Sequence, residues 1–128
     1  MLNLVAVALG GSVGALARYG LNKWVMGTAG ASVALYFPLG ILIANVLGSC
    51  LMGVLYVWLV ERSGASEELR LALTVGLLGA FTTFSTFAID TVVLIEAGQV
   101  LKAVANVALN VGLCVGGCWL GLLAGRAF

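Results

Sequence analysis

Long apolar segments without charge alternate with short polar segments along the whole chain. Four runs carry no charged side chain: residues 2–17, 39–60, 71–89 and 103–125. The first of them continues as largely apolar sequence beyond Arg18 as far as Met26. About 20 helical residues cross the hydrocarbon core of a bilayer. The pattern therefore predicts an all-α membrane protein with four transmembrane helices, in one domain that covers residues 1–128.

Three polar breaks separate the runs, at residues 27–32, 61–68 and 96–102. Because these connections are short, neighbouring helices are expected to be antiparallel. The small residues at positions 6–8 resemble a signal-peptide cleavage site, but no lysine or arginine precedes them and the apolar run continues past them. We therefore expect the first segment to remain as a permanent span.

Composition supports a lipid environment. Hydrophobic residues make up 62% of the 128 positions and charged residues 9%, with a mean hydropathy of +1.18. A soluble domain of this length leaves too much of its surface in water to hide so many apolar side chains. The expected partner is therefore the bilayer, and no nucleic acid is expected.

The six basic residues are divided evenly between the two membrane faces that four spans would give. Arg62, Arg70 and Arg126 fall on the side of the N-terminus, and Arg18, Lys23 and Lys102 fall on the other side. Orientation is normally set by an excess of lysine and arginine on the cytoplasmic side. The three-to-three balance predicts insertion in both orientations, although one or two charges near the ends could instead fix a single topology.

Small residues recur at the spacing that lets lipid-embedded helices approach closely. Examples are the pairs Gly10 and Gly14, and Ala44 and Gly48, and glycines are frequent between residues 112 and 125. Four short helices have little interior of their own, so an oligomer is expected. With dual insertion, an antiparallel homodimer is a natural closed assembly.

The segment "GAFTTFSTF" (residues 79–87) concentrates hydroxyl and aromatic side chains at membrane depth. Threonine and serine disfavour a regular helix, so this part of the third helix is expected to be broken in its middle. Freed carbonyls there could bind a cation. The alternative is a continuous helix whose hydroxyls bond back to the preceding turn.

Neutral hydrogen-bond donors accompany this segment in the other spans. Asn45 with Ser49, and Asn106 with Asn110, are each one helical turn apart. Uncharged donors suit an anion that must bind weakly enough to leave again.

Two rings of the segment fit the same interpretation. Phe84 and Phe87 are spaced to lie on one helical stripe and can present their electropositive edges to an anion. Ordinary packing is the alternative for these rings.

Enzymatic and redox chemistry are not expected. The chain has no histidine, and its three cysteines form no Cys-x-x-Cys motif. No nucleophile, base and orienting group are placed together, so an enzyme is the least favoured class.

Three stretches resemble the signatures of the Fluc family of bacterial fluoride channels, also called CrcB-type proteins. They are "GGSVGALARY" (residues 10–19), "FPLGILIANVLGSCLMG" (residues 37–53) and "GLLGAFTTFSTFAID" (residues 76–90). The resemblance runs in order along the whole chain. It implies a dual-topology antiparallel homodimer in the bacterial inner membrane with two pathways through which fluoride leaves passively, relieving its toxicity.

Matched motif by motif, the resemblance implies functional residues at specific positions. The implied fluoride pathway comprises Asn45, Phe84, Ser85, Thr86, Phe87, Asn106 and Asn110. Arg18 would lie in an aqueous vestibule. Backbone carbonyls of Gly79 and Thr82 would hold a structural Na⁺ at the dimer interface, with capping or packing as the alternative role of Thr82. Two departures stand out: Asp90 replaces a more usual glutamate, and Asn106 replaces an aromatic residue.

Two further classes remain as alternatives to a channel. A small dual-topology multidrug transporter would also have four spans, but it needs an acidic residue within its first helix, and this chain has none there. A purely structural helical bundle would explain the glycines but not the cluster of hydroxyls and rings.

Overall fold

The computed structural model describes residues 1–28, 37–62 and 65–128, and within these ranges it is helical without any strand. Four helical segments are long and apolar enough to cross a membrane: Leu2–Thr28, Leu39–Glu61, Glu67–Glu96 and Val100–Ala127. The prediction of an all-helical, four-span membrane protein is confirmed.

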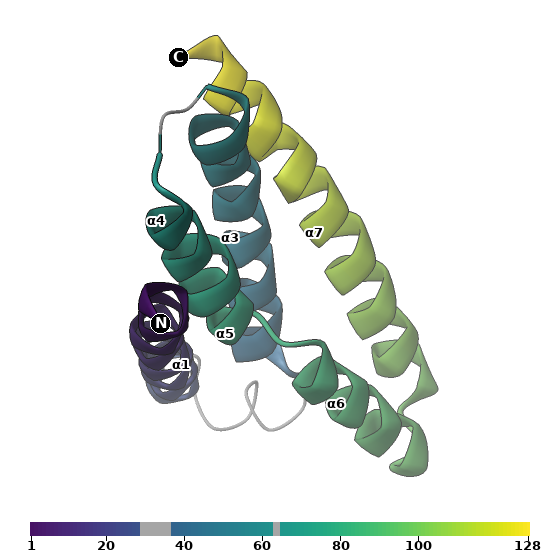
Figure 1. Cartoon of the computed structure of the whole chain (residues 1–128). Helices are drawn as coiled ribbons and strands as arrows, with labels where there is room; N and C mark the ends of the chain where they lie inside the picture. The colour runs from purple at the N-terminus through teal and green to yellow at the C-terminus, as the bar shows by residue number, and fades with distance from the viewer. Residues whose placement is uncertain (29–36, 63–64) are drawn as a thin grey trace.

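Among the described residues, the spans are built from eight helical elements and one interruption (Figure 1). The first span is α1 (Leu2–Thr28), and the second is α3 (Leu39–Tyr56) followed by the π-helical turn η1 (Val57–Glu61). The third contains α4 (Glu67–Leu71), the π-helical stretch η2 (Ala72–Leu78), α5 (Gly79–Phe81) and α6 (Phe84–Glu96). The fourth is α7 (Val100–Ala127).

The helices extend further into the polar breaks than the sequence predicts. Residues 27 and 28 are still helical, and the rest of the first break, residues 29–32, lies outside the described residues. In the second break, Ser66 caps α4 by accepting a hydrogen bond from the Leu69 N–H (3.3 Å), so Glu67 and Glu68 form the first helical turn. Carboxylates are favourable at that end of the helix dipole.

The third break is likewise shorter than residues 96–102. It shrinks to a three-residue turn in which Gly98 adopts a positive φ of 71°. Glycine reaches this backbone conformation without steric cost, so α7 can begin at Val100.

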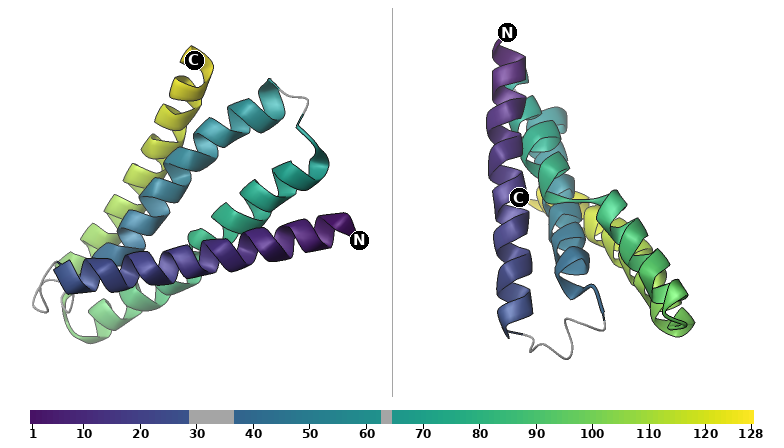
Figure 2. Two further views of the ribbon diagram at one scale, coloured as in Figure 1. Left: turned by 90° about the vertical axis from the view of Figure 1, so that its left-hand side faces the viewer. Right: turned by 90° about the horizontal axis from the view of Figure 1, so that it is seen from below.

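Helices α3 and α7 lie side by side, and α1 lies against η2 and α5 (Figure 2). Both contacts are made through glycines. A Cβ atom added at Gly121 would overlap the carbonyl of Cys50, and one added at Gly14 would overlap the carbonyl of Leu77. The absence of a side chain therefore brings the backbones together, as is typical of helix pairs in membranes.

Substitution of Gly121 is expected to loosen the α3–α7 pair. Gly121→Ala places a methyl group against the backbone of Cys50, which cannot move aside as a side chain would. Overpacking of this kind costs roughly 1–3 kcal/mol. The variant should lose its monodisperse size-exclusion peak at a lower temperature than the parent. Gly112→Ala in the same helix is the control, because no atom of the described residues lies within 4 Å of a Cβ there. Equal losses for both variants would refute the packing explanation.

Large apolar side chains cover the outside of the helices. On α1, Leu4, Leu9 and Leu16 are each at least 65% exposed, and Gly14 and Val25 are its buried residues. In the membrane this surface faces lipid or another protein chain rather than water.

Candidate functional site

The third span is interrupted at two threonines. Thr82 (φ −85°, ψ 158°) and Thr83 (φ −154°, ψ 121°) are extended, between the end of α5 at Phe81 and the start of α6 at Phe84. Figure 1 shows the resulting offset between the two helices. Thr83 caps α6 by accepting a hydrogen bond from the Thr86 N–H through its Oγ1 (3.2 Å). At the end of α5, the Thr82 hydroxyl and the Thr82 N–H both donate to the Leu78 carbonyl (3.0 Å each).

Asn45 of α3 satisfies the backbone that this interruption frees. Its Oδ1 accepts a hydrogen bond from the Thr83 N–H (2.8 Å), and its Nδ2 donates to the Thr83 carbonyl (3.1 Å). Asn45 is only 9% exposed. Unpaired backbone groups at membrane depth are costly, and non-helical backbone is tolerated there only where protein or a cavity surrounds it.

A chain of hydrogen bonds continues from Asn45 across α7 and returns to α6. The Asn45 Nδ2 also donates to Asn110 Oδ1 (3.0 Å), and the Asn110 Nδ2 donates to both Asn106 Oδ1 and the Asn106 carbonyl (3.0 Å each). The Asn106 Nδ2 donates to Thr91 Oγ1 (2.9 Å). We call this set the asparagine ladder; its members are Thr83, Asn45, Asn110, Asn106 and Thr91.

The two phenylalanine rings of α6 contact each other. Their centroids are 5.2 Å apart and their planes are inclined at 57°, a common geometry for paired rings. Phe87 is 7% exposed, whereas Phe84 is 78% exposed. One ring is therefore fixed in the fold and the other stands on its surface.

A cavity of about 370 Å³, which we call the ring cavity, brings several predicted residues together. Its polar and aromatic lining consists of Asn45, Ser49, Thr82, Thr83, Phe84, Phe87 and Asn110. Apolar and sulfur-containing residues of α3 and α7 complete it: Gly48, Met52, Val111, Cys114, Val115 and Cys118. The rings thus share one space with neutral amide and hydroxyl groups.

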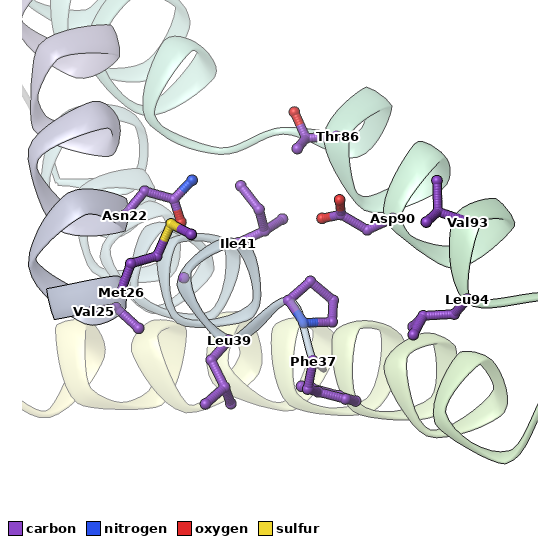
Figure 3. Close-up of a pocket in the computed structure, with 12 residues that line it drawn as sticks. Asn22, Val25, Met26, Phe37, Leu39, Ile41, Thr86, Asp90, Val93 and Leu94 are labelled. Atoms are coloured by element: carbon purple, nitrogen blue, oxygen red, sulfur yellow. The ribbon is translucent and has the colours of Figure 1, made fainter. Parts of the chain in front are cut away.

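A second cavity, of about 260 Å³, lies between α1, the start of α3 and α6. We call it the carboxylate cavity, because Asp90 of α6 points into it toward Asn22 of α1 (Figure 3). Thr86 lines it one turn before Asp90 and accepts a hydrogen bond from Thr83 Oγ1 (3.1 Å), which leaves the proton of the Thr86 hydroxyl for the cavity. Thr83 lines the ring cavity and is joined to the carboxylate cavity through its hydrogen bond to Thr86.

The family is identified by the sequence as a whole. Residues 5–122 match the family described as "CrcB-like protein, Camphor Resistance (CrcB)". This chain belongs to the CrcB family. The chain is similar to proteins from several bacteria that are called "Fluoride-specific ion channel FluC". The one from Coxiella burnetii is 44% identical over 126 residues, covering 98% of both chains. One from a Shewanella species is 50% identical over 121 residues, covering 94% of both.

A third relative of the same name is longer than this CrcB chain. The protein from Methylococcus capsulatus is 46% identical over 125 residues, which are 98% of this chain but 53% of the relative. The chain thus spans about half of that protein's length.

The other residues predicted for the site lie outside both cavities. Ser85 is exposed, and its Oγ is 3.2 Å from Thr83 Oγ1. Asn106 is 1% exposed and lines neither cavity. Arg18 is half-buried on α1, one turn before Asn22. Gly79 is exposed at the start of α5.

Three residues of this CrcB site were not singled out from the sequence. Thr83 was seen only as one hydroxyl of the cluster, whereas it is the point where the ladder meets the interruption. Thr91 follows the predicted Phe87 by one helical turn, and Asn22 follows the predicted Arg18 by one turn. That spacing could have indicated that each shares a helix face with a predicted site residue.

Proposed function

We propose that this CrcB chain is a fluoride channel through which fluoride leaves the cell passively across the bacterial inner membrane. Its relatives in three bacteria are called fluoride-specific ion channels. The observation that carries the proposal is the ring cavity, in which Phe84, Phe87 and neutral amides meet at an interruption of a membrane span. Such a lining offers an anion many weak contacts and no full positive charge.

The asparagine ladder supports a narrower choice of the groups that could contact an ion. Both N–H groups of Asn45 are engaged, with the Thr83 carbonyl and with Asn110. The ring edges, the hydroxyl of Ser49 and two cysteine thiols are the remaining partners in the ring cavity, and the hydroxyl of Thr86 lies in the neighbouring carboxylate cavity. In this proposal the asparagines hold the pathway's shape while rings and hydroxyls contact the ion.

Fluoride efflux from proteoliposomes tests the function. Vesicles loaded with potassium fluoride and containing the purified protein should release fluoride to an external electrode when potassium permeability is supplied. Vesicles loaded with chloride are the control and should release it far more slowly. Absence of fluoride release, or equal release of chloride, would refute a fluoride channel. Release of a cationic dye driven by a proton gradient would favour the drug-transporter alternative.

We also propose that the channel is an antiparallel homodimer of chains inserted in both orientations. The three-to-three charge balance supports dual insertion. The 78% exposure of Phe84 supports a second chain, because a ring of the pathway requires a partner that closes the space beside it. Reporter tags on the termini should be found on both sides of the membrane; a single orientation would contradict this arrangement.

The interruption of the third span also supports the proposed Na⁺ site. In a continuous helix the Thr83 N–H would bond the Gly79 carbonyl and the Thr86 N–H would bond the Thr82 carbonyl, but here they donate to Asn45 and to Thr83 Oγ1. The two carbonyl oxygens are thereby released. Hard cations prefer such oxygen ligands. We propose that Gly79 and Thr82 of both chains hold Na⁺ at the dimer interface, where the ion would supply positive charge and bind the two chains together.

Removal of sodium is therefore expected to weaken the dimer. Protein purified with N-methylglucamine in place of Na⁺ should shift toward the monomer in size-exclusion chromatography and lose fluoride flux, because repulsion between facing carbonyls would no longer be balanced. Restoring Na⁺ to the same sample is the control and should reverse both changes. A stable, fully conducting dimer without sodium would rule out the proposed ion.

A further inference from the structure

We propose that the buried Asn106 and the half-buried Thr91 form a positioning pair that fixes the Phe87 ring and that neither side chain contacts the permeating ion. This inference rests on the proposed channel function. It reassigns Asn106, which the family resemblance places in the fluoride pathway.

The surroundings of Asn106 argue against direct contact with an ion. It is 1% exposed and is absent from the lining of both cavities. Its Nδ2 donates to Thr91 Oγ1 (2.9 Å), and its Oδ1 accepts from the Asn110 Nδ2 (3.0 Å). The amide is thus held at both ends by other members of the asparagine ladder, and it lies behind the ring cavity rather than in its wall.

Thr91 connects the asparagine ladder to the backbone of Phe87. Its hydroxyl accepts from Asn106 and donates to the carbonyl of Phe87 (2.8 Å), so the peptide group that carries the ring lies at the end of the ladder. A hydroxyl that both accepts and donates binds more firmly, because each hydrogen bond polarises the next.

Thr91 and Thr83 hold α6 at points on either side of Phe87. Thr83 lies four residues before the ring and is bound by Asn45 of α3, and Thr91 lies four residues after it and is bound by Asn106 of α7. Asn110 joins the two asparagines. Phe87 therefore lies between two attachments that share one network, which accounts for one fixed ring beside an exposed one. If α6 moved relative to α7, the hydrogen bond between Thr91 and Asn106 would have to break.

The first test removes the Thr91 hydroxyl while keeping the shape of the side chain. Thr91→Val should lower the fluoride efflux rate roughly five- to tenfold, the effect expected when one partly buried hydrogen-bond partner is lost. Thr91→Ser restores the hydroxyl and should restore the rate. Thr74→Val is the matched control, because the Thr74 hydroxyl also donates to the carbonyl four residues earlier (Arg70, 2.7 Å) but lines neither cavity.

A double-mutant cycle separates positioning from ion contact. Asn106→Leu leaves the Asn110 Nδ2 its bond to the backbone carbonyl of residue 106 and is expected to reproduce the effect of Thr91→Val. If the two side chains act as one pair, the double variant should be no slower than the slower single variant. If Asn106 binds the ion, Asn106→Leu should be much slower than Thr91→Val and the two effects should multiply, which would overturn the proposal.

A spectroscopic measurement reports directly on the environment and mobility of the ring at position 87. Fluorine NMR of a para-fluorophenylalanine introduced at position 87 should show one line in the parent and a shifted or broadened line in Thr91→Val, with no change in Thr74→Val. An unchanged line and an unchanged efflux rate in Thr91→Val would refute the positioning pair alone. Absence of fluoride flux in the parent protein would instead refute the channel function.

Discussion

Phe87→Ile is expected to lower the fluoride efflux rate by roughly thirtyfold while the protein still assembles. Isoleucine fills the buried position in the ring cavity with a similar apolar side chain but has no electropositive ring edge. A cation over the face of a ring gains on the order of 2 kcal/mol away from water. By analogy we assign the anion at the ring edge a contact of the same size, and about 2 kcal/mol at the barrier corresponds to about thirtyfold in rate. The measurement is electrode-recorded efflux from proteoliposomes, with size-exclusion chromatography of the same preparation.

Phe81→Ile is the matched control for this change. Phe81 ends α5 in the same segment, beside Gly48, and does not line the ring cavity. Its substitution should leave the rate within about twofold of the parent, as expected away from the site. Phe84→Ile should slow efflux as Phe87→Ile does, because the exposed ring belongs to the same cavity. Equal rates for Phe87→Ile and the parent would remove the rings from the pathway.

Asn45→Ala is expected to destabilise the fold as well as stop conduction. The substitution leaves the N–H and the carbonyl of Thr83 without partners and removes the donor to Asn110. Each buried polar group without a partner costs about 1–3 kcal/mol. With both backbone groups affected, a loss of roughly 2–6 kcal/mol follows. Heating in detergent followed by size-exclusion chromatography should show loss of folded protein at a markedly lower temperature.

Asn3→Ala controls for the loss of an amide side chain as such. Asn3 lies in the first turn of α1, far along the chain from the interruption, and takes no part in the hydrogen bonds of the asparagine ladder. It should melt like the parent. If Asn45→Ala also melted like the parent, the N–H and carbonyl of Thr83 would be bonded to other groups in the variant. Asn45 would then not be needed to stabilise the interruption.

Most of the membrane architecture could be predicted from the sequence. The four spans depend on the length of uncharged apolar runs, which is a property of consecutive residues, and all four are present. The glycines that bring α1 to η2 and α3 to α7 were visible as small-residue spacings, although the spacing of Gly121 did not reveal which carbonyl it faces. Helix ends were less well predicted, because caps such as Ser66 extend a helix into a polar segment.

The candidate site could be predicted in its residue types but not in its connections. The hydroxyls and rings at residues 79–87, together with Asn45 and Asn110, pointed to the region that contains the ring cavity. Thr86, predicted to continue the same row of hydroxyls, lines the carboxylate cavity instead. A helix turns by about 100° per residue, so neighbours in sequence face different spaces.

The sequence by itself determined that this chain lies in a membrane, how many times it crosses, and where its polar groups are concentrated, because hydrophobicity and helical spacing act over a few neighbouring residues. Only the tertiary structure decided how those polar groups are used. Asn45 pairs with a backbone 38 residues away and with an amide 65 residues away. An amide can donate to any carbonyl or hydroxyl within about 3 Å, so its partner is chosen by how the helices pack and not by its own position in the chain.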